Sequence, residues 1–131
     1  MMKLPQKVVD LIDGKNFAHV ATIMKDGSPQ VSAVWIDREG DVIVFNTAEG
    51  RVKYNNLKRD GRVAISIADA TNPYNEVWIR GKVIEITGVG ADAHIDSLAK
   101  KYLGKDEYPW KTPTEKRVIV RIAAERINPG R

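Results

Sequence analysis

The sequence predicts a mainly β protein, an antiparallel barrel that carries peripheral helices. Three observations support this fold class. Six segments combine β-favouring residues with nearby turn residues, and the three helical segments do not form a repeating βαβ order. The chain has 131 residues, the length of one domain with one core. We therefore expect a single domain over residues 1–131, in the order helix, three strands, helix, two strands, helix, strand.

The first half of the chain alternates short elements with turns. Residues Pro5–Asp13 place apolar side chains at near-helical spacing and predict a short helix that Gly14 ends. The next segments are short, apolar and separated by turn residues, which favours up-and-down strands. Strands are expected at Phe17–Ile23, Gln30–Ile36 and Asp41–Asn46, with turns at Lys25–Ser28 and Asp37–Gly40.

The second half repeats this alternation with longer segments. A basic helix is expected at Gly50–Asp60, and an amphipathic helix at Ala91–Leu103 with Gly104 behind it. The remaining segments alternate apolar and polar residues as strands do. Strands are expected at Arg62–Ala68, Glu76–Thr87 and Arg117–Ile127, with a proline-containing loop at Asp69–Asn75.

Composition limits the possible function classes. The chain is 43% hydrophobic and 29% charged, which is ordinary for a globular protein. It has no cysteine, so a thiolate nucleophile, a disulfide and a cysteine-ligated metal are excluded. The start lacks the apolar run of a signal peptide, and no segment approaches the roughly 20 apolar residues of a membrane span. We expect a cytoplasmic protein that does not associate with membranes.

The segment around the basic helix contains the components of an anion site. A strand end supplies Asn46 and Thr47, and the helix start supplies Arg51 and Lys53. Backbone N–H groups at a helix start attract negative charge, and an arginine can hold phosphate oxygens with two parallel hydrogen bonds. The alternative is that the basic side chains only solvate one helix, and charge content alone favours it. The residues alone leave both interpretations open.

Residues 45–66 resemble the signature of the pyridoxamine-phosphate-oxidase-like family of split barrels; they read FNTAEGRVKYNNLKRDGRVAIS. The segments Gln30–Trp35, 72–81 and 102–110 are similar to the family's second strand, central strand and late loop, so the resemblance covers nearly the whole chain. The pattern is most similar to a short branch that uses the deazaflavin coenzyme F420 in place of flavin mononucleotide (FMN). The resemblance implies a six-stranded antiparallel split β-barrel of the FMN-binding type, and a homodimer.

The resemblance also implies roles for individual residues. Arg51 and Lys53 would contact the cofactor phosphate, with Thr47 and Asn56 as nearby hydrogen-bonding partners. The segment Ser32, Ala33, Val34 and Trp35 would line the tricyclic ring, and Trp78, Arg80 and Trp110 would complete the pocket from the other subunit. No residue is assigned a catalytic role, because the cofactor would carry the chemistry and pass a hydride to a small electron-poor acceptor.

The sequence departs from the family pattern in three respects. Gly61 stands where the family turn has proline, and Val52 stands where another basic residue is common. The chain also lacks the longer C-terminal segment with which true pyridoxamine-phosphate oxidases hold their substrate. We therefore expect an activity other than vitamin B6 oxidation.

Other conspicuous residues indicate no further site. His19 and His94 have no metal-ligand spacing around them, so we expect both to be structural. The pairs Asp10 with Asp13 and Asp92 with Asp96 have helical spacing and are expected to be solvated. Each of Trp35, Trp78 and Trp110 can belong to the core, a dimer interface or the pocket; the sequence does not decide between these.

The sequence leaves three functions open within this fold. The first is an F420-dependent reductase, and the second is an oxidoreductase that uses FMN through the same phosphate anchor. The third is a non-catalytic protein that stores, carries or senses a flavin-like or haem-like ligand. Nucleic-acid binding is not expected, because the basic residues gather on one short helix without the interleaved aromatic residues of a single-strand site.

Overall fold

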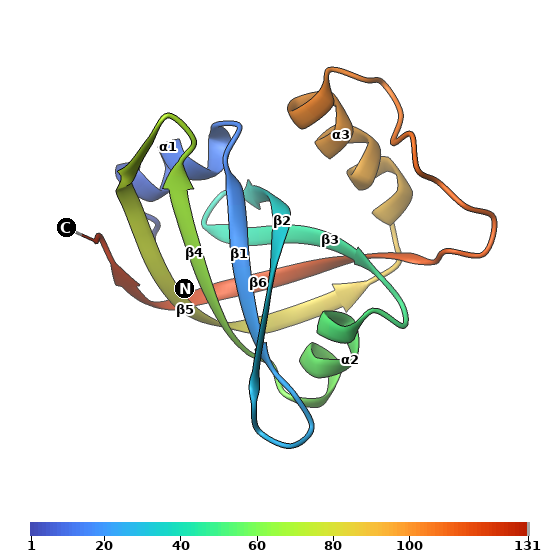
Figure 1. Cartoon of the computed structure of the whole chain (residues 1–131), viewed down its shortest axis with the longest axis horizontal. Coiled ribbons are helices and arrows are strands. Elements are labelled where there is room, and N and C mark those ends of the chain that lie inside the picture. Colours follow the sequence, from blue (N-terminus) through green and yellow to red (C-terminus); the bar gives the residue numbers. More distant parts are fainter. Residues whose placement is uncertain (131) are drawn as a thin grey trace.

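The computed structural model describes residues 1–130, which form a barrel of six strands with three helices outside it (Figure 1). The strands are β1 (Phe17–Ile23), β2 (Pro29–Glu39), β3 (Val42–Ala48), β4 (Arg62–Asp69), β5 (Asn72–Thr87) and β6 (Arg117–Asn128). The helices are α1 (Gln6–Asp13), α2 (Val52–Arg59) and α3 (Ala91–Leu103). No helix within residues 1–130 is long and apolar enough to cross a membrane.

The strands close into a barrel in the order β1, β2, β3, β6, β5, β4, and every neighbouring pair is antiparallel. Inward-facing side chains such as Ile36, Phe45 and Ile67 are fully buried. Helix α1 packs against β2 and β4 and adds Val8 and Ile12 to the same core. The structure therefore confirms the mainly β class, the six-stranded antiparallel barrel and the peripheral helices.

Two expected segment boundaries are wrong. The turn expected at Asp37–Gly40 is shorter, because β2 continues to Glu39 and pairs there with Val42, so the chain reverses around Gly40 at φ 61°. The loop expected at Asp69–Asn75 is instead a two-residue turn between β4 and β5. Pro73 can enter a strand because the register shifts beside Asp69, so the proline needs no ladder N–H.

The other two helices and one loop lie together outside the barrel. Helix α2 packs against β1, and α3 packs against β2, β3 and β6, so the two helices flank the end of β3 (Figure 1). The loop of residues 104–116 leaves α3 and returns to the start of β6 on this same side (Figure 1). These elements surround the candidate site.

Candidate functional site

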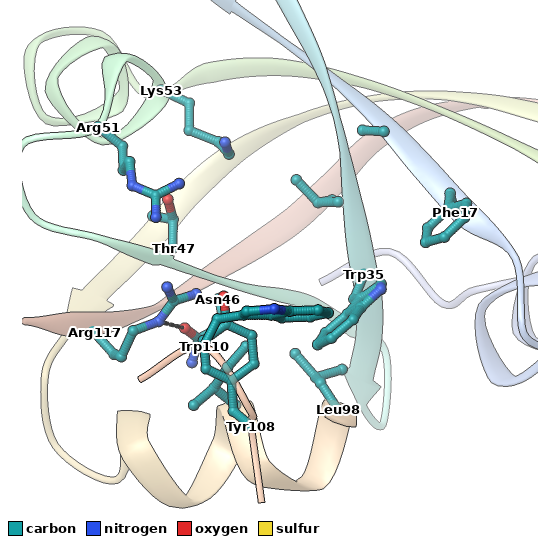
Figure 2. A pocket seen from close by; sticks show the side chains of 13 residues that line it. Phe17, Trp35, Asn46, Thr47, Arg51, Lys53, Leu98, Tyr108, Trp110 and Arg117 are labelled. Atoms are coloured by element: carbon teal, nitrogen blue, oxygen red, sulfur yellow. Dashed lines mark hydrogen bonds between the residues drawn. The ribbon is translucent and has the colours of Figure 1, made fainter. Parts of the chain in front are cut away.

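A cavity of about 260 Å³ lies between β2, β3, α2, α3 and the 104–116 loop (Figure 2). One side is cationic and polar, and the other is aromatic and aliphatic. The lining residues are Arg51, Lys53, Arg117, Asn46 and Thr47 on the polar side, and Phe17, Trp35, Tyr108, Trp110, Ala33, Val34, Ile95 and Leu98 on the apolar side. The cavity therefore suits a ligand with an anionic end and a flat apolar end.

The cationic side is built by local chain geometry. Gly50 adopts φ 88°, which lets the chain turn sharply from the end of β3 into α2. Arg51 stands immediately before α2 in an extended conformation, and Lys53 lies in the first turn of this helix. Arg117 begins β6 and pairs with Ala48, the last residue of β3. Two distant segments thus place three cations around one strand end.

The three cations are only partly neutralised. Burial, together with the neighbouring charges of Arg51 and Arg117, lowers the pKa of Lys53. Glu115 lies 3.4 Å from Arg51 and also pairs with Arg117. Among the residues that the structure describes, Glu115 is the one acidic residue that pairs with any of these three cations, and it pairs with the two arginines. The excess positive charge fits an anionic group such as a phosphate.

Thr47 and Asn56 were expected to be phosphate neighbours, and the structure separates them. Thr47 is 3% exposed and lines the cavity beside Arg51. Asn56 is also buried but lies outside the cavity lining. Its Nδ2 donates to Thr22 Oγ1 at 2.9 Å, and its Oδ1 accepts from Arg59 at 2.8 Å. Asn56 therefore holds α2 against β1.

The apolar side carries a cluster of aromatic rings, which includes Trp35, Tyr108 and Trp110 (Figure 2). Trp35 stacks on Tyr102 with ring centroids 5.4 Å apart and planes 7° apart. Trp110 lies 6.5 Å from Trp35, and Tyr108 meets both indoles edge-on. Such surfaces favour a planar conjugated ligand, because flat rings stack with large buried area at little entropic cost.

The loop that carries Tyr108 and Trp110 is anchored on α3. The carboxylate of Asp96 accepts from the backbone N–H of Tyr108 at 2.8 Å and from Lys111 Nζ at 3.0 Å. These two hydrogen bonds lower the pKa of Asp96. The expectation that Asp96 is only solvated is therefore wrong, because its partners come from a loop whose position the sequence does not predict.

Three residues that the resemblance assigned to the pocket do not line this cavity. Ser32 adjoins Ala33, yet it is absent from the lining. Trp78 and Arg80 line a separate groove together with Arg126, on strands β5 and β6. Trp110, in contrast, lines the cavity of its own chain. The structure thus brings Ala33, Val34, Trp35, Thr47, Arg51, Lys53 and Trp110 together.

Sequence reasoning did not assign five of the lining residues to the site. They are Phe17, Ile95, Leu98, Tyr108 and Arg117. Asn46 was named with the anion site at the strand end, and Tyr108 lies in the segment that resembles the family's late loop. Arg117 carries no local signal, because its place depends on the pairing of β3 with β6, which are more than 60 residues apart along the chain.

The fold and the cavity define a class of small antiparallel barrel proteins that have a cationic cavity beside an aromatic wall. A family model described as pyridoxamine 5'-phosphate oxidase matches residues 4–129. The chain therefore belongs to the pyridoxamine 5'-phosphate oxidase-like family of split barrels. At the level of this family, it is related to flavin-dependent oxidoreductases.

Solved structures support this assignment. A protein named F420 reductase is 30% identical, with a TM-score of 0.83, over 96% of this chain and 99% of that one. A conserved hypothetical protein from Mycobacterium tuberculosis is 25% identical, with a TM-score of 0.72, over 97% and 84% of the two chains. General Stress Protein 26 from Bacillus anthracis is 16% identical, with a TM-score of 0.66, over 93% and 89%, and shows likeness of fold alone.

Proposed function

We propose that the chain is an oxidoreductase that binds coenzyme F420 in this cavity and supports hydride transfer to a small electron-poor acceptor. The observation that carries the proposal is the meeting of three cations with an aromatic wall in one cavity. The similarity to the protein named F420 reductase favours the deazaflavin over other flavin-like cofactors.

The donor set of the cavity fits such a cofactor. Arg51, Lys53 and Arg117 provide the positive charge that a phosphate requires, and the Thr47 side chain lies beside Arg51 in the cavity lining (Figure 2). Lys53 has its pKa lowered by burial and by the two arginines, so an added anion would relieve a repulsion that is already present. Trp35 and Trp110 provide the faces for a planar ring.

When bound, the deazaflavin would supply the hydride, and the protein's own residues would orient the reactants. The cations fix the phosphate end, and the aromatic wall limits where the ring can lie. Leu98 and Ile95 from α3 make the neighbouring wall apolar, which excludes water from the acceptor side. No acid or base in the chain is assigned to the hydride transfer.

A fluorescence titration tests the cofactor. We expect tight binding of F420, weaker binding of FMN, and loss of both in Arg51→Ala and Lys53→Ala. Lys58→Ala is the matched control, because Lys58 carries the same charge on the same helix but contacts Tyr54 and does not line the cavity. Wild-type affinity in the Lys58 variant would show that the effect is local and does not arise from net charge.

The same titration separates the alternatives. Tight binding of FMN in place of F420 would assign the chain to the FMN-dependent oxidoreductases of this fold, because the phosphate anchor serves either cofactor. Binding without turnover of any electron-poor acceptor would favour a protein that stores or senses its ligand. Binding of neither cofactor would overturn the proposed function.

We further propose that two copies of the chain associate to complete the cavity. A volume of about 260 Å³ lies below the roughly 300–1,000 Å³ of pockets that enclose a whole cofactor. Trp78 is 46% exposed on the outer face of β5, and Arg80 lies beside it on the same face. An exposed indole with a neighbouring arginine is typical of interface residues.

Light scattering tests this association directly. We expect the mass of a dimer for the wild type at micromolar concentration and a shift toward monomer in Trp78→Ala. Tyr74→Ala is the control, since Tyr74 is an even more exposed aromatic residue, at 71%, but lies in the first residues of β5 and does not line the groove of Trp78. A monomeric wild type would contradict the association.

A further inference from the structure

The side-chain amide of Asn46 has a fixed orientation. Arg117 Nε–H can only donate, and it faces Asn46 Oδ1 at 2.8 Å (Figure 2). The Ala91 carbonyl can only accept, and it faces Asn46 Nδ2 at 3.0 Å. Asn46 is 7% exposed, so water cannot readily replace either partner. Both contacts therefore require the same orientation of the amide.

This orientation determines which ring nitrogen of His94 carries a proton. Asn46 Nδ2 also lies 3.1 Å from His94 Nδ1, so that nitrogen must accept a hydrogen bond and carry no proton. The remaining proton of the neutral ring is then on Nε2, which lies 3.4 Å from Asp37 Oδ2. The four side chains form one series that runs from the cavity to the partly exposed Asp37: Arg117, Asn46, His94 and Asp37.

Protonation of His94 is incompatible with this series. A proton on Nδ1 would point at the Asn46 amide N–H, so the amide would have to rotate. The rotated amide would then present its N–H₂ group to Arg117 and its oxygen to the Ala91 carbonyl, and both hydrogen bonds would be lost. Arg117 would lose the hydrogen bond that fixes its Nε, although its ion pair with Glu115 and its contact with the Tyr108 ring would remain.

Charged groups around His94 come from several elements. Asp37 and Glu39 lie on β2, and Arg121 of β6 pairs with Glu39 at 2.7 Å. Lys101 of α3 acts on Asp37. Burial raises the pKa of Asp37, but hydrogen bonds from His94 and from the backbone N–H of Arg38 outweigh it, and the pKa stays below its ordinary value. Asp37 therefore remains a carboxylate when His94 gains a proton.

We propose that Asn46 and neutral His94 are positioning residues for the anion site, so that protonation of His94 releases Arg117 and weakens anion binding. The inference rests on the proposed function in one respect: it assumes that the same cationic cavity binds an anion. It concerns the anion alone, so it can be tested without a redox cofactor.

The direction of the effect separates this inference from simple electrostatics. An added positive charge near a cationic cavity would strengthen anion binding as the pH falls. Release of Arg117 would weaken it instead. Loss of a hydrogen-bonded guanidinium corresponds to roughly a tenfold decrease in affinity.

The test is a titration with sulfate, which stays doubly charged throughout the range in which histidine side chains titrate, about pH 8 to about pH 5.5. The indole N–H signals of Trp35 and Trp110 follow binding by NMR. The chain has two histidines, so His19→Asn is a matched control: His19 is exposed on β1 and does not line the cavity. In His94→Asn, the new Oδ1 takes the place of Nδ1 as an acceptor that cannot be protonated.

We expect sulfate affinity to fall as the pH falls in the wild type and in His19→Asn. In His94→Asn the affinity should stay, at every pH, at the value that the wild type has at high pH. Asn46→Ala should bind weakly at every pH. A wild-type affinity that stays constant or rises at low pH, or a fall that persists in His94→Asn, would overturn the inference while leaving the anion site in place. Sulfate binding that does not depend on Arg51 would overturn both.

Discussion

Helices α1 and α2 are both eight residues long, and neither has a side-chain hydrogen bond at its N-cap, yet the two are held in opposite ways. Helix α1 buries Val8, Leu11 and Ile12 in the barrel core. Helix α2 buries one apolar residue, Leu57, together with the polar Asn56. The first helix is therefore attached by apolar burial, and the second mainly by hydrogen bonds.

This difference shows which helix serves stability and which serves the site. An apolar face that enters the core gains free energy in proportion to the area it buries. Helix α2 buries one apolar residue and therefore gains less of this free energy. Its first turn places Lys53 at the cavity, with Arg51 immediately before the helix. Variants in the two helices should therefore affect different properties.

The largest expected effect is on stability, from Ile12→Ala in α1. Ile12 is fully buried, so the truncation should lower the free energy of unfolding by about 3 kcal/mol through lost burial and a residual cavity. Chemical denaturation measures this change. Val52→Ala in α2 is the control, since Val52 is 49% exposed and its truncation should change stability by less than about 0.5 kcal/mol. Equal losses in the two variants would contradict the comparison.

The next effect is on binding, from Arg51→Ala. The Arg51 side chain is half-exposed and pairs with Glu115, so its removal should leave the free energy of unfolding nearly unchanged. Cofactor or phosphate affinity should fall by about 30-fold, which corresponds to loss of a charge-assisted contact of about 2 kcal/mol. Calorimetric titration at constant ionic strength measures it. A variant that unfolds easily but still binds would reverse the assigned roles.

Asn56→Ala should affect both properties moderately. It removes the hydrogen bond to Thr22 that holds α2 on β1 and the one to Arg59 within α2, at a cost of about 1–2 kcal/mol in unfolding free energy. Anion affinity should fall several-fold, because the helix start is less well fixed. Thr22→Val provides a second measure, because it removes the hydrogen bond between Asn56 and Thr22 by changing the residue on β1. Loss of affinity without loss of stability would instead indicate that Asn56 touches the ligand.

The smallest expected effect is a gain in stability. The pKa of Lys53 is lowered in the folded protein, so the unfolded chain holds this proton more firmly and the charged side chain destabilises the fold. Lys53→Met should therefore raise the free energy of unfolding by less than about 1 kcal/mol near neutral pH. The gain should vanish as the pH rises through the range in which lysine titrates. Denaturation at several pH values, with Lys58→Met as the exposed control, checks the sign.

The sequence was sufficient for most of the fold because the hydrophobic pattern is local. The alternation in β1, β4 and β6 and the apolar spacing in α1 and α3 each identify their element within about ten residues. The loop expected at Asp69–Asn75 failed because a register shift let Pro73 join a strand. That shift depends on pairing between strands, which a local pattern does not contain.

The same distinction between local patterns and contacts of distant segments explains which site residues could be predicted. Arg51 and Lys53 were recognisable because they follow a strand end and a glycine within one segment. Arg117 and Asn46 act together only because β6 lies beside β3, and Asp96 acts on a loop more than ten residues away. Asn56 was assigned to the phosphate from the resemblance, yet its buried amide faces Thr22 instead of the cavity. Contacts between distant segments were therefore the part that sequence reasoning could not supply.

The closure of the barrel has a consequence for how copies of this chain can meet. Each of the six strands pairs with a neighbour on both sides over part of its length, so within residues 1–130 the barrel leaves few backbone groups for another chain to pair with. One such stretch is Pro29–Trp35 of β2, which pairs with β1 but not with β3. A second copy that meets the barrel elsewhere must contact it face to face through side chains, which makes such an association sensitive to single substitutions.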